Sequence, residues 1–329
     1  MTQRSFIERR QRDWKELEQI IGGGTKELKA GAENFPRMLR KLTGDLNTAR
    51  SNGFDPSLIE RLNRLILEGN QLLYRGKPFR LSLLSDFMFK TFPGAVRSQW
   101  RSLGVCFLIF YGLAVFSALL VIRFPGFIHE IMPYRTVKSL ERMYDPADEQ
   151  YLKPREVSND ADMFGFYIYN NISIAFRIFG SGILAGAGSL FMLAFNAVFL
   201  GAAEGHIINR GFTETFYSFV SGHSSLELTA IIFSAQAGLL LGWRLFITRG
   251  LSRGASVREA GKTALPIIGG SALMLVLAAA VEAFWSSRHE IPPPVHYAAG
   301  GLITLALLAY FLFAGRGKSS PAGPKEGGT

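Results

Sequence analysis

Five long apolar segments fill the second two-thirds of this 329-residue chain, and acidic side chains lie within two of them. Glu227 stands at the start of the apolar stretch 226–247, and Glu282 stands near the end of the stretch 263–285. An ionised carboxylate at mid-bilayer costs about 2.5–3.5 kcal/mol even on the most lenient insertion scale, so such acids usually face a bundle interior or a wet cavity. The chain is therefore expected to be a polytopic membrane protein with a polar centre.

The composition supports this class and argues against nucleic-acid binding. Hydrophobic residues make up 48% of the chain and charged residues only 19%, which leaves long stretches without charge. The formal net charge of +10 comes from Lys and Arg that gather in the first hundred residues and in short loops, as expected of cytoplasmic flanks that face anionic lipid. No nucleic-acid-binding motif is present, so the expected partner of these charges is membrane lipid. The polar, basic opening predicts no cleavable signal peptide.

Residues 1–80 are predicted to form a basic helical region in the cytoplasm. Apolar residues recur at helical spacing over residues 6–21, and the triple glycine at 22–24 is expected to end this first helix. A second helix is predicted over residues 33–50. A third should begin after Asp55, because Pro56 suits the first position of a helix, and should run to Tyr74.

The remaining chain is predicted to enter and cross the membrane. Residues 81–102 mix basic and aromatic side chains, which is typical of an amphipathic helix in the headgroup plane, here called the elbow. A transmembrane domain should follow over residues 103–314, since each ordinary span has about the 20 apolar residues that a bilayer requires. Its segments are 103–122, 164–203, 226–247, 263–285 and 296–314, and the Gly- and Pro-rich tail 315–329 is expected to be disordered.

The charges of the loops constrain how often segment 164–203 crosses. The loop 248–262 is basic and should lie inside with the N-terminus, whereas the connecting segment 124–163 has more acids than bases and should lie outside. Segment 164–203 must then cross twice or not at all. Because Gly180 and Gly182 break its middle, we expect a broken or re-entrant helical hairpin, in which 164–179 enters and 183–203 returns. The alternative is a plain five-span protein whose tail lies outside.

Several short motifs stand out along the apolar part. They are Phe-Gly-Phe-Tyr-Ile-Tyr-Asn-Asn from Phe164, Gly-Ser-Gly from Gly180, Asn-Ala-Val-Phe-Leu-Gly from Asn196, His-Ser-Ser-Leu-Glu from His223 and Glu-Ala-Phe-Trp from Glu282. Together they resemble the stage II sporulation protein M family of integral membrane proteins. The opening residues look like the N-terminal region of members from non-sporulating bacteria, so the resemblance covers nearly the whole chain. It implies a multi-pass protein of the bacterial cytoplasmic (inner) membrane with a cytoplasmic N-terminus.

The resemblance also implies the kind of partner. In spore formers the family member belongs to a membrane complex with peptidoglycan hydrolases. Elsewhere members are often encoded beside a MoxR-type AAA+ ATPase and proteins with von Willebrand factor A-like domains. The expected partners are therefore such an ATPase, such von Willebrand factor A-like proteins or cell-wall hydrolases, and a homo-oligomer is compatible with the sequence. The family offers no established catalytic residues, and no cofactor is expected.

The polar residues in and beside the spans are the candidate functional core. His223 and Glu227 are four residues apart and should share one helix face. Together with Glu204, His206 and Glu282 they could converge to bind a divalent metal, for which His223 and Glu227 alone supply two ligands, or to relay protons. The structural alternative is a neutral Glu227, hydrogen-bonded to His223 or to a facing backbone group, that locks the bundle.

Small and amide residues complete the candidate core. Asn170, Asn171 and Asn196 are predicted to form hydrogen bonds across helices. The glycines at 180, 182, 186, 188 and 201 should allow helices to approach closely. The sequence lacks the His-Glu-x-x-His zinc-protease motif, the Gly-x-x-x-x-Gly-Lys-Ser/Thr nucleotide loop and the Gly-x-Ser-x-Gly nucleophile elbow, so no enzymatic activity is expected.

These observations lead to one expected function and two alternatives. We expect an all-α membrane bundle that acts as a non-enzymatic scaffold or adaptor of an envelope-associated complex. Its N-terminal helices would dock a cytoplasmic partner, and segment 124–163 would face envelope partners. The first alternative is a small transporter or channel that uses the buried Glu and His residues. The second is an intramembrane metal-dependent hydrolase that uses His223, Glu227 and Glu282.

Overall fold

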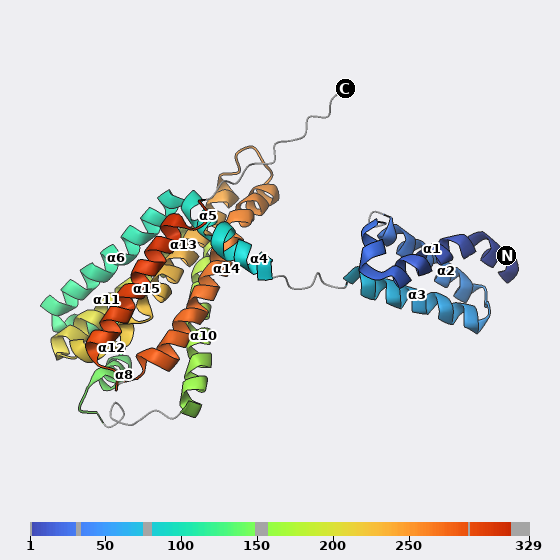
Figure 1. The fold of residues 1–329 in the computed structure, drawn as a ribbon. Helices are drawn as coiled ribbons and strands as arrows, with labels where there is room; N and C mark the ends of the chain where they lie inside the picture. The colour runs from blue at the N-terminus through green and yellow to red at the C-terminus, as the bar shows by residue number, and fades with distance from the viewer. Residues whose placement is uncertain (1, 31–33, 75–80, 149–156, 289, 317–329) are drawn as a thin grey trace. The chain divides into compact units, whose positions relative to one another are not determined.

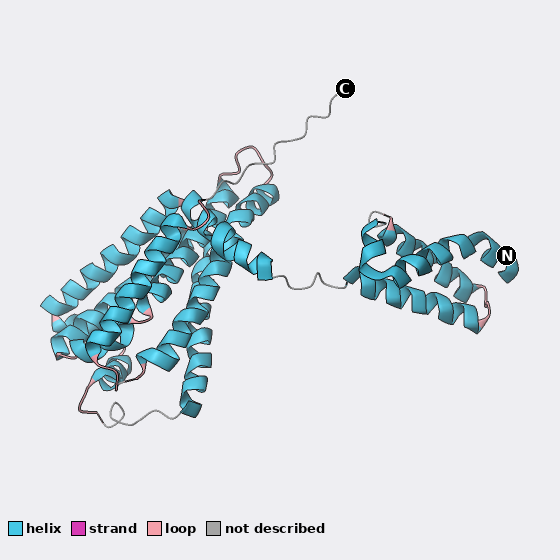
Figure 2. Ribbon diagram, viewed as in Figure 1, coloured by secondary structure: helices cyan, strands magenta, loops and turns pink. Residues whose placement is uncertain are grey.

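The chain folds into helices that form two compact units. The computed structural model describes residues 2–30, 34–74, 81–148, 157–288 and 290–316 (Figure 1). All regular elements among these residues are helices, which confirms the predicted all-α fold (Figure 2). The N-terminal unit is Met1–Leu81 and the C-terminal unit is Ser82–Thr329. The predicted disordered tail, 315–329, lies outside the described residues from residue 317 onward.

The N-terminal unit is a three-helix domain with its own hydrophobic core. The apolar faces read from the sequence pack together, so that Trp14, Leu42 and Leu62 are fully buried. At the edge of this core the carboxylate of Asp45 accepts hydrogen bonds from Arg10 Nε at 2.9 Å and from Trp14 Nε1 at 2.8 Å. The helices are α1 Gln3–Ala30, α2 Phe35–Ser51 and α3 Pro56–Tyr74.

The prediction that the triple glycine ends the first helix is wrong. Helix α1 continues through residues 22–24 to Ala30. Glycine costs a helix about 1 kcal/mol relative to alanine, but it does not forbid helical backbone angles. Ile20 and Ile21, just before the glycines, pack against the core of the unit. The glycines therefore weaken this helix locally without ending it.

The elbow is anchored in the bundle of the C-terminal unit. Phe92 is fully buried, with its ring 6.0 Å from that of Phe233 and 5.4 Å from that of Phe311. Arg97 Nη1 donates to the carbonyl of Phe311 at 2.8 Å. A segment expected to lie in the headgroup plane therefore also inserts an aromatic side chain between helices. Its elements are α4 Leu81–Asp86, the π-helical turn η1 Phe87–Thr91 and α5 Phe92–Ser98.

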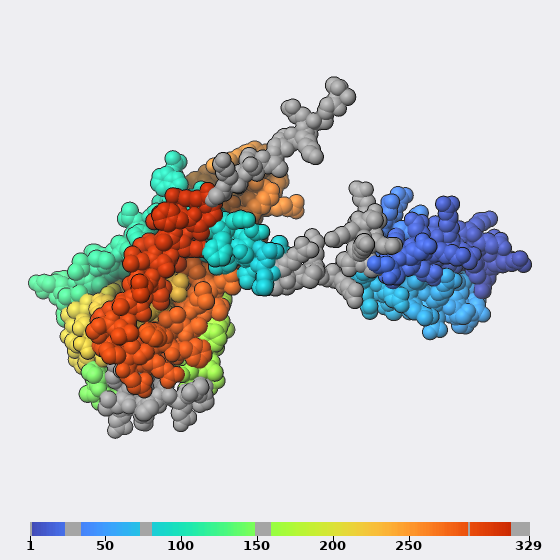
Figure 3. Space-filling model, viewed as in Figure 1, coloured from blue at the N-terminus to red at the C-terminus, as the bar shows by residue number. Residues whose placement is uncertain are grey.

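The C-terminal unit contains five helices that are long and apolar enough to cross a membrane, counted over the described residues. They are α6 Trp100–Arg123, α11 Ala187–Arg210, α13 Ser224–Phe246, α14 Arg253–Val281 with its continuation η4 Glu282–Ser286, and α15 Pro293–Phe313. Helix α15 lies on the surface of this unit (red in Figure 3), where Leu302, Leu305 and Leu308 are exposed. Large apolar side chains on the outside of a bundle are expected where the surroundings are lipid.

The predicted break in segment 164–203 separates two complete helices. Helix α10, Val157–Gly180, and helix α11 have 24 residues each, which at 1.5 Å per residue is about 36 Å. The turn η3, Ser181–Ile183, and Gly186 with a φ of 82° join them. Both helices are long enough for a full hairpin, but only α11 is also apolar enough to count as a membrane span, so the number of crossings by this pair stays a prediction. Helix α10 packs along α13 and α14.

The two ends of the bundle hold different connections (Figure 1). One end, here the elbow end, holds α5, the turn after α10, the loop after α13 and the end of α15. Accordingly, Gln236 Nε2 in α13 donates to the carbonyls of Val96 and Gln99, both at 3.1 Å. The opposite end, here the far end, holds α8 Tyr134–Tyr144 and α12 Thr213–Ser221. This alternation agrees with two crossings by residues 164–203, while the side of the membrane that each end faces stays a prediction.

Glycines bring several of these helices into backbone contact, as predicted. A Cβ at Gly201 of α11 would overlap the carbonyl oxygen of Ala114 in α6, and one at Gly182 would overlap that of Gly238 in α13. Only a residue without a side chain fits at such a crossing. At Gly180, by contrast, an added Cβ would meet no atom within 4 Å, and this residue is the last of α10.

Candidate functional site

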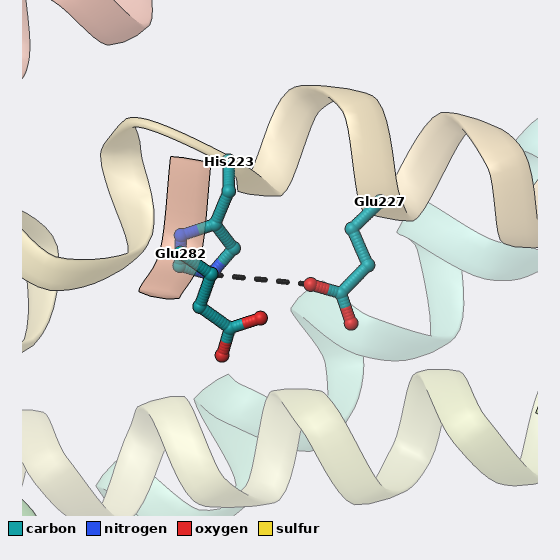
Figure 4. A group of neighbouring side chains, drawn as sticks. All are labelled: His223, Glu227 and Glu282. Atoms are coloured by element: carbon teal, nitrogen blue, oxygen red, sulfur yellow. Dashed lines mark ion pairs between the residues drawn. The ribbon is translucent and has the colours of Figure 1, made fainter. Parts of the chain in front are cut away.

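His223, Glu227 and Glu282 meet inside the far end of the bundle, and we call these three residues the His–Glu cluster. One ligand atom from each lies within 4.8 Å of the other two. The closest printed approach joins His223 Nε2 and Glu227 Oε2 at 3.9 Å. Figure 4 shows the imidazole and the two carboxylates turned toward one another. The structure thus brings together three of the five residues for which the sequence suggested a convergence.

The local backbone explains how the cluster forms. His223 immediately precedes α13 and Glu227 lies one turn further on, so the pair shares a face of that helix. Helices α13 and α14 pack extensively along one another, which brings Glu282 to the same place. At Glu282 the α-helix α14 changes into the π-helical turn η4. Such π turns inside helices are rare and occur frequently at functional sites.

The cluster is largely shielded from solvent. The exposed fractions of His223 and Glu282 are 4% and 8%, and Glu227 is half-buried. The ring of Phe219 in α12 contacts the His223 imidazole edge-on, with centroids 5.3 Å apart. On the other side of that imidazole, Nδ1 lies 3.0 Å from the hydroxyl oxygen of Ser286. If Nδ1 carries the proton, it donates to Ser286 and leaves the Nε2 lone pair facing the carboxylates.

Tyr144, the last residue of α8, contributes from the connecting segment. Its ring packs on Phe216 and Phe219 of α12, with centroids 5.0 and 6.1 Å away. Burial, followed by the negative charges of Glu282 and Glu227, raises the pKa of the Tyr144 hydroxyl above its ordinary value. The hydroxyl therefore keeps its proton at neutral pH. The segment that joins α6 to α10 thus supplies part of the surroundings of the cluster.

Comparison with known families identifies the two units separately. A family model described as stage II sporulation protein M matches residues 104–287, more than half of the chain. The chain belongs to the stage II sporulation protein M family. A second model, described as a domain of unknown function (DUF8413), matches residues 4–75, in the N-terminal unit. No curated protein and no solved structure matches the chain.

Membership of the stage II sporulation protein M family and the apolar helices together make this a multi-pass membrane protein. The region matched by the family model begins in α6 and ends just after η4. It contains the His–Glu cluster, the α10–α11 hairpin and the connecting segment. The elbow and α15 lie outside the match, although Phe92 and Phe311 pack on the matched helices.

The predicted convergence of five polar residues is wrong for two of them. Glu204 in α11 accepts a hydrogen bond from the Tyr217 hydroxyl at 2.6 Å, and His206 Nε2 lies 3.0 Å from Glu141 Oε1 in α8. Helix α11 packs mainly against α6 and also contacts α8, so its last turns face the connecting segment. The direction in which a helix turns its polar residues depends on this packing, which local spacing does not reveal.

Glu141 connects α8 to α11 through a hydrogen bond and an ion pair. Besides His206, it has Lys138 Nζ at 2.7 Å from its Oε2 and Arg210 Nε at 3.4 Å from its Oε1. Burial raises the pKa of Glu141, but the hydrogen bonds from Lys138 and His206 and the charge of Arg210 outweigh it and hold that pKa below its usual value. In this family member the carboxylate of Glu141 is therefore held in its charged form.

The three asparagines do not make the predicted cross-helix hydrogen bonds in the described part of the chain. Asn170 Nδ2 donates to Asn171 Oδ1 at 3.0 Å, and Asn196 Nδ2 donates to the carbonyl of Met192, one turn earlier in its own helix, at 2.7 Å. Short polar side chains commonly satisfy themselves locally in this way. The three side chains are therefore satisfied within their own helices and do not belong to the His–Glu cluster.

The sequence reading missed several residues near the cluster. Ser286 and Tyr144 were not among the candidate site residues. The ion pair in which Arg288 Nη2 donates to the fully buried Asp160 at 2.6 Å was not predicted either. Ser286 follows Glu282 by four residues, a spacing that offered a weak signal. Nothing in the sequence links Tyr144 to His223, because the two lie far apart along the chain and meet only through the packing of α8 on α12.

Proposed function

We propose that this family member is a non-enzymatic scaffold or adaptor of an envelope-associated complex in the bacterial inner membrane, with its N-terminal unit in the cytoplasm. The observation that carries the proposal is the division into two units, each with its own core and its own family match. A membrane anchor alone needs no separately packed helical domain. A domain joined to a lipid-facing bundle suits a protein that holds a soluble partner at the membrane.

The N-terminal unit offers a defined surface for such a partner. A groove between α1 and α2 is lined by both basic and acidic side chains, including Arg10, Asp13, Glu16, Arg37 and Lys41. Asp45, bonded to Arg10 and Trp14, forms part of its wall and fixes the two helices against each other. Complementary charges at a rigid surface favour selective and fast association between proteins. The partner we propose is a MoxR-type AAA+ ATPase or a von Willebrand factor A-like protein.

The far end of the bundle would face envelope partners such as cell-wall hydrolases. There, α8 is held on α11 by the contacts of Glu141 and on α12 by the ring of Tyr144. The connecting segment is thus a fixed part of the bundle's surface over its described residues. In this arrangement the soluble partner binds the N-terminal unit and the envelope partner binds the far end of the bundle.

Affinity capture of the full-length tagged protein from native membranes in mild detergent tests the proposal. The double variant Arg37→Glu, Lys41→Glu reverses two exposed charges in the groove, and Arg64→Glu on α3 reverses an exposed charge outside it. We expect the wild type and Arg64→Glu to capture an AAA+ ATPase or a von Willebrand factor A-like protein, and the double variant to lose it. Equal capture in all three samples would show that the groove does not bind the partner. A wild type that captures no such partner would overturn the scaffold function.

The convergence of the His–Glu cluster favours a second candidate function, a small transporter or channel. Acids buried inside a bundle are typical of proton and ion pathways. Reconstituted into vesicles, a transporter would give a proton or cation flux that Glu227→Gln abolishes and Glu204→Gln leaves unchanged. Vesicles without flux above the protein-free background would reject this candidate.

A further inference from the structure

We propose that the His–Glu cluster binds a divalent transition-metal ion, with zinc as the best match to its donors. One imidazole nitrogen and two carboxylate groups are ordinary zinc ligands, and three protein ligands leave a fourth position open. The magnesium and calcium ions prefer sites made of oxygen alone, so the histidine favours a transition metal. This inference is independent of the scaffold function, since it concerns the far end of the bundle and not the N-terminal groove.

The geometry lies close to that of a metal site. Ligand atoms bound to one zinc ion at about 2.1 Å in a tetrahedral arrangement are roughly 3.4 Å apart. In the His–Glu cluster the atoms of His223 and Glu227 are 3.9 Å apart, and all three lie within 4.8 Å. The His223–Glu227 pair therefore needs to contract by about 0.5 Å, and no pair needs more than about 1.4 Å, which a rotation of the flexible Glu side chains provides.

The surroundings of His223 resemble those of a metal ligand. A metal-binding histidine almost always uses its second ring nitrogen in a hydrogen bond that fixes the tautomer and the orientation of the ring. The Ser286 hydroxyl oxygen lies 3.0 Å from His223 Nδ1, and Phe219 holds the ring from another side. With the proton on Nδ1, the free electron pair of Nε2 points to where Glu227 and Glu282 present their oxygens.

The charges also fit a doubly charged cation. A bound ion would hold both carboxylates in their ionised form, so that with a neutral imidazole the three ligands would carry two negative charges. Buried charges are expensive unless they are paired or coordinate a metal. An ion of charge +2 would neutralise the cluster and would join the start of α13 to the π-helical turn that ends α14. The position of Glu282 at the first residue of that turn agrees with a local distortion that serves binding.

Metal analysis of the purified full-length protein tests the inference. The protein is extracted in detergent without chelator, and its zinc, manganese and iron are measured by mass spectrometry together with its concentration. We expect about one bound ion per chain in the wild type and in the control Glu204→Gln, whose carboxylate lies outside the cluster. Variants His223→Ala, Glu227→Gln and Glu282→Gln should lose most of it. A wild type without metal, even after incubation with zinc, would overturn the inference, and so would metal that persists in His223→Ala.

Two further measurements separate binding from misfolding. Removal of the hydrogen-bonding partner in Ser286→Ala should weaken zinc binding by about 10–100-fold while leaving the bundle folded, because such partners tune affinity without touching the ion. Titration of the chelator-treated protein with zinc should raise the Tm of the wild type and of Glu204→Gln, because a ligand that binds only the folded state stabilises it. The Tm of the isosteric Glu227→Gln variant should not rise. A zinc-dependent Tm in Glu227→Gln equal to that of the wild type would place the ion elsewhere.

Discussion

The N-terminal and C-terminal units distribute the same residue types in opposite ways. In the N-terminal unit, Trp14 and Leu62 are buried, and the described charged side chains other than Asp45 are exposed or half-exposed. In the C-terminal unit, Leu305 and many other large apolar residues are exposed, whereas His223 and Glu282 are buried. Both patterns follow from one rule, the removal of apolar surface from water, applied in two different surroundings. The comparison shows that one unit is built for water and the other for lipid.

The buried carboxylates of the two units differ as well. Asp45 in the N-terminal unit has a permanent cation, Arg10, and an indole N–H as partners, so its charge is balanced within the domain. In the His–Glu cluster two carboxylates share one imidazole within 4.8 Å. A carboxylate paired with a guanidinium stabilises a fold, whereas two carboxylates and an imidazole that approach one another supply the kinds of ligand that bind a cation. This difference separates a structural contact from a candidate site.

The largest expected difference in stability comes from truncating one leucine to alanine in each unit. Leu62→Ala removes a side chain with no exposed surface and should destabilise the N-terminal unit by about 2–5 kcal/mol, the usual cost of a core cavity. Leu305→Ala, at a position 64% exposed, should change the stability of the bundle by only about 0.5 kcal/mol. Hydrogen exchange of both units in the detergent-solubilised protein measures the two effects. A large loss for Leu305→Ala would mean that α15 is covered by protein and not by lipid.

A smaller effect is expected where helices touch through glycine. Gly201→Ala places a Cβ on the carbonyl oxygen of Ala114 and should destabilise the α6–α11 pair by about 1–3 kcal/mol through overpacking. Gly112→Ala on α6 has no neighbour within 4 Å and should be neutral or slightly stabilising, since alanine favours the helix. Thermal unfolding in the same detergent compares the two variants. An equal Tm for both would show that the close crossing is not formed in the membrane protein.

The smallest expected effect is the change with pH in the stability of α8, in the connecting segment. The pKa of Glu141 is lower in the folded protein than its usual value near 4.5, so its contribution to stability is complete above that value and is lost as the pH falls through the lower, folded pKa. Hydrogen-exchange protection of α8, corrected for intrinsic rates, should therefore fall at acidic pH. This fall should be absent in Glu141→Gln, whose protection is low throughout, and should persist in the control Glu130→Gln on the same segment. A wild-type protection that does not change with pH would contradict the assigned role of Glu141.

Much of the fold could be predicted because its signals are local. The spans follow from the length of each apolar run, the break at Gly180 follows from small residues, and His223 and Glu227 meet because they are four residues apart in one helix. The prediction failed where the course of a helix or the partner of a side chain does not follow from local sequence. Helix α1 passes through three glycines because glycine weakens a helix without forbidding it. Glu204 and His206 turn to Tyr217 and Glu141 because α11 packs on α6. Tyr144 comes near the cluster through tertiary contacts that no spacing reveals, and for Ser286 only its distance of four residues from Glu282 gave a weak signal.

The measurement that tests the account most directly compares partner capture and bound metal in the same two variants. The central claim is that the N-terminal unit docks a soluble partner while the far end of the bundle binds a cation. Arg37→Glu, Lys41→Glu should therefore lose the captured ATPase or von Willebrand factor A-like protein and keep its metal. His223→Ala should lose the metal and keep the partner. The division of roles between the two units is contradicted if either variant loses both the partner and the metal. It is also contradicted if the double variant keeps its partner and His223→Ala keeps its metal.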